Sequence, residues 1–396
     1  MKTMRQVAAV TMMNLRSLPQ RIGTSLVIVI GIGGVVAVLV SVLAMSTGMI
    51  RTMENSGRDD RAIVLRNGSA AENGSAIPRD SARLILDSPG VKRDAEGKPI
   101  GSADTLRLLI THRQEDGAEV NVALRGVGPQ VLKVRPEMKI IAGRIFNPAV
   151  NEIIVGKQAA KQFQGLAIGD KVTTRGATWT VVGHFSSGGD SHESELMADA
   201  ETVMSSDHRI SYQSIIVMLD SPASYQKFKD ALSSNPALAV DVNHEREYYE
   251  RASATIGKVI SVVAYVVGGI MAIGAIFGAL NTMYSAVSQR LVEIATLRAI
   301  GFGSTAMVVS VLVEALVLSF IGGAIGALLA YVFFNGHVVG SSTGGAASGH
   351  LIFELAVTPT LISVGIVWAC TIGLLGGFFP AVRAARLPVA TALRAV

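Results

Sequence analysis

Four long apolar stretches constrain the fold of this chain more than any other feature of its sequence. Residues 22–50, 259–289 and 355–382 contain no charged residue, and residues 299–353 contain only Glu314. A helix needs about 20 predominantly apolar residues to cross the hydrocarbon core of a bilayer. We therefore predict transmembrane helices at residues 24–48, 259–287, 305–334 and 360–380.

The acidic residues divide the chain into regions of different character. All but Glu293, Glu314 and Glu354 lie between positions 54 and 250. Only 16% of the chain is charged, against roughly 25% in a typical soluble protein, and the deficit lies in the apolar flanks. These observations predict an α-helical membrane protein with four transmembrane helices and an inserted α+β extracytoplasmic domain at residues 49–258. A segment of that size can bury its own core.

Short apolar runs in the inserted domain predict strands and a few helices. The turn-rich sequence Gln-Glu-Asp-Gly at 114–117 separates two such runs and indicates a hairpin. Residues 212–219, 224–233 and 239–242 have the patterns of a strand, a helix and a strand, which is typical of an α+β layer. We expect one α+β subdomain built from both ends of the segment, with a β-rich insert at about 138–203.

The distribution of Lys and Arg predicts the orientation in the membrane. The basic residues beside the spans are Lys2, Arg5, Arg16 and Arg21 before the first, Arg290 and Arg298 after the second, and Arg383, Arg386 and Arg394 after the fourth. Because cytoplasmic loops are enriched in Lys and Arg, we expect both termini and residues 288–304 to be cytoplasmic. The excess positive charge beside the spans suits the anionic surface of a lipid bilayer and does not indicate binding of nucleic acid.

These inferences divide the whole chain into segments. The first span is expected to be retained, because its core at 26–43 exceeds the 7–15 residues or so of a signal-peptide core. The predicted segments are a cytoplasmic amphipathic N-terminal helix (1–23), the first span (24–48), the extracytoplasmic domain (49–258), the second span (259–287), a short cytoplasmic helix (288–304), the third span (305–334), an outer loop (335–359), the fourth span (360–380) and a cytoplasmic tail (381–396).

The sequence contains no motif that predicts catalysis. A Walker A loop requires Gly-x-x-x-x-Gly-Lys-Ser/Thr so that backbone amides and a lysine hold the phosphates, and none of the Gly-Lys pairs here is followed by Ser or Thr. Asp190, His192 and Glu193 suggest a metal cluster, but no spaced set of further ligands supports one. We interpret residues 186–190 as an exposed loop and expect no metal.

Residues 288–302 form the most informative segment outside the spans. The apolar residues at helical spacing are Leu291, Ile294 and Leu297, with Ile300 close behind. The charged residues on other faces are Arg290, Glu293 and Arg298. Gly301 is placed to end the helix in a left-handed conformation. The pattern fits a short amphipathic helix that binds a groove on a partner, and it also fits a connector helix that lies on the membrane surface.

The same segment resembles the cytoplasmic loop of the MacB/FtsX-like family of ABC transporter permeases, which has an R-x-x-E-I-x-x-L-R-A-I-G pattern between spans two and three. The tail at 380–394 is similar to the P-A-x-x-A-A-x-x-x-P-x-x-A-L-R ending of these permeases. Residues 142–156 and 181–183 are similar to the MacB-type extracytoplasmic domain, and a basic helix like that at 4–18 precedes the first span in the family. MacB itself has a fused N-terminal ATPase domain, which this chain lacks.

The resemblance implies a permease of the bacterial inner membrane that works with a second permease copy, identical or different, and a separate ATPase subunit. ATP and Mg²⁺ would be bound by that subunit, and this chain would bind no cofactor. The residues that would couple it to the ATPase are Arg290, Glu293, Leu297, Arg298 and Gly301. The family implies ATP-driven mechanical work outside the membrane, in efflux or envelope transport of hydrophobic substrates, and it leaves open a periplasmic adaptor and an outer-membrane channel. The alternative hypothesis is a non-transporting, FtsX-like regulator or scaffold.

Three glycine pairs and one acidic residue lie within the predicted spans. The Gly-x-x-x-Gly pairs are Gly274/Gly278, Gly322/Gly326 and Gly373/Gly377. Because glycine lets helix backbones approach closely, each pair is interpreted either as a dimer interface or as packing within one subunit. An acid inside a membrane is costly. Glu314 is therefore interpreted either as a functional residue or as a structural one that reaches the interface or pairs with Arg298 or a partner.

Overall fold

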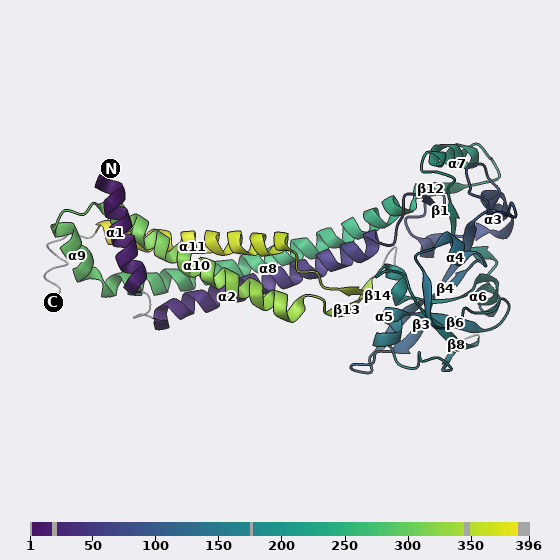
Figure 1. The fold of residues 1–396 in the computed structure, drawn as a ribbon, viewed down its shortest axis with the longest axis horizontal. Coiled ribbons are helices and arrows are strands. Elements are labelled where there is room, and N and C mark those ends of the chain that lie inside the picture. The colour runs from purple at the N-terminus through teal and green to yellow at the C-terminus, as the bar shows by residue number, and fades with distance from the viewer. Residues whose placement is uncertain (1, 18–21, 175–176, 344–348, 387–396) are drawn as a thin grey trace. The chain divides into compact units, whose positions relative to one another are not determined.

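A computed structural model describes residues 2–17, 22–174, 177–343 and 349–386. The chain forms two compact units, and each is described here by itself (Figure 1). The helical unit comprises residues 1–47, 258–337 and 355–396. The α+β domain comprises residues 48–257 and 338–354.

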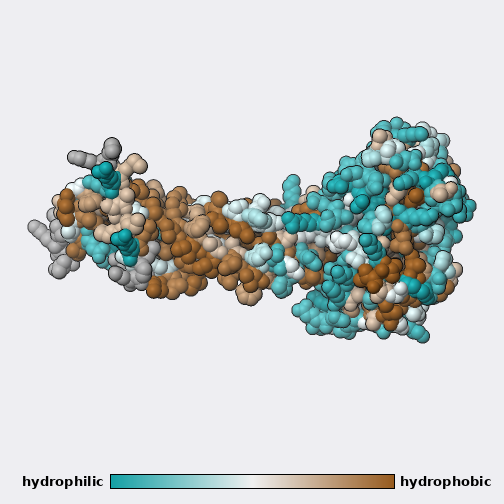
Figure 2. Space-filling model, viewed as in Figure 1, coloured by the Kyte–Doolittle hydropathy of each residue, from teal (hydrophilic) through white to brown (hydrophobic). Residues whose placement is uncertain are grey.

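The helical unit is built from long apolar helices. Its helices are α1 (Lys2–Ser17), α2 (Ile22–Glu54), α8 (Glu245–Gln289), α9 (Leu291–Ala299), α10 (Ser304–Phe334) and α11 (Pro359–Arg386). Within the described ranges, α2, α8, α10 and α11 are long and apolar enough to cross a membrane, as predicted. Figure 2 shows hydrophobic residues over this bundle.

Two of these helices are longer than the spans predicted from hydropathy. Helix α2 continues to Glu54 and α8 already begins at Glu245, so the chain passes from one unit to the other inside both helices. The added turn at the start of α8 has the sequence Glu-Arg-Glu-Tyr. A hydropathy criterion cannot detect such polar turns, because it measures transfer into lipid and not helix formation.

The glycine pair of α10 lies against α2 within the helical unit. A Cβ atom added at Gly322 would lie 2.8 Å from the carbonyl oxygen of Val29, and one at Gly326 would collide with the backbone of Gly33. Only glycine allows two helix backbones to approach so closely. This pair therefore packs within one subunit.

The glycine pair of α11 packs in the same way against α10. Gly373 faces the side chain of Ser319, and Gly377 faces the Cβ atom of Ala315. Added methyl groups at these glycines would collide with α10. The small residues thus let the third and fourth predicted spans lie side by side along much of their length (Figure 1).

The remaining pair, Gly274/Gly278, lies on an open face of α8. A Cβ atom at either position would meet nothing within 4 Å in the described structure. Helix α8 is also the least covered of the four apolar helices: 17% of its apolar window is buried, against 44% for α2 and α10. Among the described residues, none packs against this pair.

The α+β domain is centred on a long mixed sheet. Its strands are β1 (Arg61–Arg66), β3 (Gly101–His112), β4 (Glu119–Val127), β5 (Lys139–Gly143), β6 (Glu152–Gly156), β7 (Lys171–Thr173), β8 (Thr178–Ser186), β9 (Leu196–Asp199), β11 (Ser214–Met218) and β12 (Val240–His244). The described strands follow the order β12-β1-β11-β3-β4-β9-β6-β8-β5, and β7 pairs with β8. The pairs β4–β9 and β6–β8 are parallel, and the other pairs of this sheet are antiparallel.

Several elements predicted from the sequence are present in this domain. Strands β3 and β4 form a hairpin around residues 114–117, and helix α7 (Ser224–Ser233) coincides with the predicted helix. The strands of the predicted insert, β5 to β9, continue the same sheet. The remaining elements are β2 (Ile77–Pro78), β10 (Ser211–Tyr212), α3 (Arg79–Leu86), α4 (Val131–Val134), α5 (Lys157–Gln162), α6 (Ala200–Ser206), and the 3-10 turns η2 (Glu72–Gly74) and η3 (Ser191–Ser194).

The segment between the third and fourth spans is more than the outer loop that we predicted at 335–359. Strands β13 (Val338–Thr343) and β14 (Gly349–Glu354) form an antiparallel hairpin that belongs to the α+β domain. Ile352 is 1% exposed and lies in the apolar core that includes Val122 of β4. The Gly- and Ser-rich sequence hid this hairpin, because it has little of the alternation that marks a strand.

The exposed loop that we predicted at 186–190 is exposed only in part, and the residues that follow it are buried. The buried residues are Ser187, Asp190, Ser191, His192, Glu193 and Ser194, whereas Gly188 and Gly189 are exposed. Burial raises the pKa of Asp190. A Glu193 oxygen accepts hydrogen bonds from the Ser186 hydroxyl and from two backbone amides. These local partners allow a polar segment to be buried. No group of three or more His, Cys, Asp or Glu that could hold a metal occurs in the described part of the chain.

Candidate coupling site

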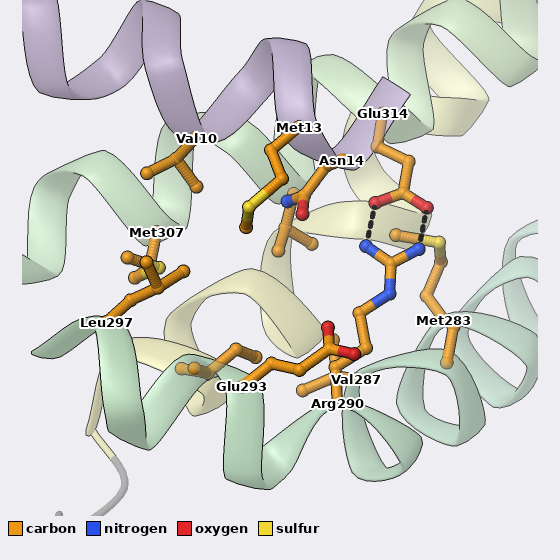
Figure 3. A pocket seen from close by; sticks show the side chains of 13 residues that line it. Val10, Met13, Asn14, Met283, Val287, Arg290, Glu293, Leu297, Met307 and Glu314 are labelled. Atoms are coloured by element: carbon orange, nitrogen blue, oxygen red, sulfur yellow. Dashed lines mark hydrogen bonds and ion pairs between the residues drawn. The ribbon is translucent and has the colours of Figure 1, made fainter. Parts of the chain in front are cut away.

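The candidate site is centred on the break between α8 and α9. Helix α8 ends at Gln289 and α9 begins at Leu291, so Arg290 alone separates them. The Arg290 backbone has φ −103° and ψ 12°, which is the sparsely populated bridge region. This single non-helical residue interrupts the helix, and the Arg290 side chain points toward α10 (Figure 3).

Glu314 of α10 receives the Arg290 guanidinium in a bidentate pair. Nη1 donates to Oε2 at 2.8 Å and Nη2 donates to Oε1 at 2.7 Å (Figure 3). Each side chain is only 6% exposed. This geometry is the strong, directional form of an arginine–carboxylate contact. The pair therefore joins the start of α9 to the first third of α10.

The pair corrects two predictions. Arg298 was named among the candidate partners of Glu314, and Arg290 was placed among the charges on the other faces of the short helix. The break at Arg290 cannot be seen in a helical pattern, and it moves that residue from the surface to a buried position.

The C-terminus of α9 is fixed by a glycine, as predicted. Gly301 has φ +103°, and its N–H donates to the carbonyl of Arg298 at 3.1 Å. The N–H of Phe302 donates to the carbonyl of Leu297 at 3.1 Å. This is the Schellman pattern of a helix end. Helix α9 is thus held by an ion pair of the residue that precedes it and by a tight turn that follows it.

Helix α9 has one buried face and one exposed face. Ile294 and Ala295 are buried against the helical core, and Leu297 is half-buried. The exposed residues are Val292, Glu293, Thr296, Ala299 and Ile300. Ile300, which we placed near the apolar stripe, is 72% exposed because the helix ends before it and the turn at Gly301 redirects the chain.

The N-terminal helix α1 is part of the site, which the sequence did not predict. Asn14 donates from Nδ2 to the Ser310 hydroxyl of α10 at 2.6 Å, and Gln6 donates from Nε2 to the Gly301 carbonyl at 3.4 Å. Val10 is buried in the helical core. An amphipathic pattern alone indicates an interfacial helix. A polar residue on the inner face of the helix, such as Asn14, could have indicated that α1 contacts the protein and not only the membrane surface.

These elements enclose a small pocket together with the end of α8, which contributes Met283, Ala286 and Val287. Met13, Leu297 and Met307 form part of its apolar wall, and Arg290 and Glu314 form its polar end (Figure 3). Glu293 and Leu297, both named from the sequence, line the same pocket, and Arg298 is half-buried. The predicted tail motif lies mostly outside the described residues, which end at Arg386. The site offers a short helix fixed at both ends with an exposed face.

Four apolar helices and an inserted α+β domain, in the described part of the chain, are the features of a multi-pass membrane protein. The family model of the MacB-like periplasmic core domain matches residues 22–235, and the model of the FtsX-like permease C-terminal region matches residues 265–389. The chain belongs to the MacB/FtsX-like family of ABC transporter permeases. It is a multi-pass protein of the bacterial inner membrane.

Two relatives illustrate this membership. The chain is 26% identical over 410 residues to the macrolide export ATP-binding/permease protein MacB of Shewanella sp. (strain ANA-3), covering 93% of this chain and 57% of that protein. It is 24% identical over 405 residues to the uncharacterized ABC transporter permease YknZ of Bacillus subtilis (strain 168), covering 94% of each chain. The chain thus spans little more than half of the MacB relative and nearly all of YknZ.

Two solved structures are similar to part of the chain. The extracellular domain of the noncanonic ABC-type transporter YknZ from Gram-positive bacteria has 16% identity and a TM-score of 0.36, covering 46% of this chain and 99% of that one. The periplasmic region of MacB from Actinobacillus actinomycetemcomitans has 15% identity and a TM-score of 0.37, covering 54% of this chain and 97% of that one.

Proposed function

We propose that α9 receives the movement of a separate ATP-hydrolysing subunit and that the chain transmits it to the α+β domain. The observation that supports this most directly is the fixing of α9 at both ends. Its exposed face, with Val292 and Ile300 beside Glu293, combines apolar and charged groups. An exposed helix face of this kind fits a groove on a partner protein. Because α9 is bonded to α10 through Arg290 and Glu314, a displacement of α9 moves the bundle with it.

The partner ATPase would bind the ATP and Mg²⁺, and this chain would bind no cofactor. The MacB relative is named as an ATP-binding and permease protein, and the YknZ relative as a permease. This chain matches 94% of the second, which is named as a permease only, and this supports an ATPase on a separate subunit.

The proposed orientation places α9 and both termini in the cytoplasm and the α+β domain outside the inner membrane. The Lys and Arg residues beside the spans support this orientation. The work would then be export or envelope transport of a hydrophobic substrate, with a periplasmic adaptor and an outer-membrane channel as candidate partners. The MacB relative is named for macrolide export, which is consistent with a hydrophobic substrate class.

The second permease copy would pack against the open face of α8. Gly274 and Gly278 have no neighbour within 4 Å in the described structure, whereas the other two glycine pairs are already occupied. Replacing both glycines with Leu is expected to abolish the dimer, because the side chains would separate the helices. Gly269→Leu is the matched control: Gly269 is also open but faces another side of α8. Native mass spectrometry of the purified protein would measure the oligomeric state. A dimer that persists when both Gly274 and Gly278 are replaced with Leu would contradict this interface.

The coupling proposal is tested by Glu293→Arg. This change reverses the charge on the exposed face of α9 and is expected to abolish ATPase stimulation by this chain while leaving membrane insertion intact. Glu250→Arg is the matched control, because Glu250 is exposed on α8 and lies in the α+β domain. The measurement is ATP hydrolysis by the ATPase co-purified with each variant. Normal stimulation in the Glu293 variant would contradict the assignment of α9 as the coupling helix.

A further inference from the structure

The 3-10 turn η3 contacts three of the segments that connect the α+β domain to the rest of the chain. These segments are the residues that follow α2, the first turns of α8, and β14 of the hairpin. All of the contacts lie within the α+β domain. Each residue of η3 is at most 5% exposed, so the turn is part of the domain interior.

Ser191 joins the turn to the end of α2. The Ser56 hydroxyl donates to the Ser191 hydroxyl at 2.7 Å and accepts from the Ser191 backbone N–H at 2.9 Å. Ser56 itself is fully buried. Two hydrogen bonds between the same pair of residues, shielded from water, fix their relative position more firmly than one.

Ser194 joins the turn to the hairpin in the same way. The backbone N–H of Ile352 donates to the Ser194 hydroxyl at 2.9 Å, and that hydroxyl lies 3.2 Å from the Ile352 carbonyl, to which it donates. The Ile352 side chain is buried in the same core as β4. The hairpin is therefore attached both by apolar burial and by a directional contact.

His192 provides the contact with α8. Its ring lies edge-on to the ring of Tyr249, with centroids 6.2 Å apart and an interplanar angle of 72°. Both side chains are buried. Such edge-to-face ring pairs contribute beyond the apolar area that they bury, so the first turns of α8 pack directly on the turn.

The sheet holds η3 from the opposite side. The Glu193 backbone lies so close to Gly156 of β6 that a Cβ atom there would collide with it. Glu195, which follows the turn, pairs with Arg125 of β4 at 2.7 Å. Burial alone would raise the pKa of Glu195, but the Arg125 guanidinium outweighs it and lowers that pKa well below its ordinary value. The turn is thus bonded to the centre of the sheet.

We propose that η3 is a rigid junction that joins α2, α8 and the β13–β14 hairpin to the sheet, with Ser191 and Ser194 as positioning residues for force transmission. The transmission part rests on the proposed function. The junction itself is expected to make the two units unfold together. This expectation is tested on the isolated chain, without any ATPase.

The first test uses the two tryptophans of the chain as reporters, Trp179 in the α+β domain and Trp368 in the helical unit. Full-length protein carrying Trp368→Phe or Trp179→Phe reports one unit at a time. We expect equal thermal midpoints for the two reporters, and a separation of about 4 °C or more in Ser191→Ala/Ser194→Ala. Ser102→Ala is the matched control: Ser102 is buried, accepts from the Gly128 N–H at 2.8 Å and bonds within the sheet. Coincident midpoints in the double serine variant, or the same separation in the control, would overturn the junction.

The second test measures transmission in the complex with the ATPase. Fluorophores placed at Ser304→Cys, exposed at the start of α10 and outside the proposed ATPase-binding face, and at Glu119→Cys, in a Cys370→Ser background, report the distance between the start of α10 and the α+β domain. We expect a change of energy transfer with ATP and vanadate in the parent protein and in Ser102→Ala, and its loss in the double serine variant. An unchanged response in the double variant would overturn the role in transmission. If the parent protein gives no response, the proposed function is contradicted, and so is the transmission role that rests on it. The junction is then still decided by the tryptophan test.

Discussion

Two buried arginines show how differently the two units hold a charge. In the helical unit, Arg290 forms a bidentate pair with Glu314, and its Nε has no hydrogen-bond partner in the described structure. In the α+β domain, Arg125 donates to Glu195 through Nε and Nη2 at 2.7 and 3.0 Å. It also donates to Glu72 through Nη1 and Nη2 at 2.8 and 3.0 Å. One site is a single bidentate pair, and the other is a network.

The difference indicates what each site is suited for. A network keeps a buried charge compensated when one partner is lost, which suits a sheet that must stay rigid. A single bidentate pair depends on both of its members, so loss of Glu314 removes the carboxylate that compensates the buried Arg290 charge.

The largest expected effect is that of Glu314→Ala. It leaves the Arg290 guanidinium buried without a carboxylate, which typically costs about 3–5 kcal/mol. The measurement is chemical unfolding of the full chain in detergent, followed by Trp368 fluorescence in a Trp179→Phe background. The charge-swapped double variant Arg290→Glu/Glu314→Arg should recover part of the loss. A cost below about 1 kcal/mol for Glu314→Ala would show that the pair is hydrated or replaceable.

A smaller loss is expected from Glu195→Gln in the α+β domain. Arg125 keeps Glu72, so we expect about 1–3 kcal/mol, the range for one weakened buried hydrogen bond. Trp179 fluorescence in a Trp368→Phe background reports the unfolding of this domain. Glu119→Gln is the control, because Glu119 is 73% exposed and should change the stability by no more than about 0.5 kcal/mol. A loss of stability as large as that of Glu314→Ala would contradict the contrast between the Arg125 network and the single Arg290–Glu314 pair.

The same network predicts how the stability of the α+β domain depends on pH. For both Glu72 and Glu195, burial would raise the pKa, but Arg125 lowers it below the ordinary value of 4.5. Their contribution is therefore present above about pH 4.5 and lost as the pH falls through the lowered values. Burial raises the pKa of Asp104, so its effect on the pH dependence of stability is opposite. Its contribution to stability is present at low pH and is lost as the pH rises.

Below pH 4.5, Glu195→Gln should reduce the slope of stability against pH by up to about 1.4 kcal/mol per pH unit, because one fewer carboxyl group binds a proton on unfolding. Urea titrations between pH 3 and 6, monitored through Trp179, would measure this slope. An unchanged slope would mean that Glu195 is not held ionised in the folded domain.

The sequence predicted the elements whose cause is local. The four spans follow from the absence of charge over long stretches, and the end of α9 follows from Gly301, where a positive φ is required. The partner of Glu314 was not predictable, because it depends on one non-helical residue that interrupts an otherwise helical pattern. Likewise, the burial of residues 190–194 depends on contacts with Ser56, Tyr249 and Ile352, which are distant in sequence.

The smallest expected effect on stability is also the sharpest test of what the Arg290–Glu314 pair does. Replacing both residues with apolar ones, Arg290→Met/Glu314→Leu, removes the cost of burying two charges together with their attraction. Such replacements are often neutral or stabilising, so we expect a change within about 1 kcal/mol by Trp368 fluorescence. The apolar pair lacks the two directional bonds that position α9, so ATPase stimulation should still fall. If stimulation were unchanged in a variant of unchanged stability, the pair would contribute only packing, and the positioning of α9 would have to come from the turn at Gly301 and from α1.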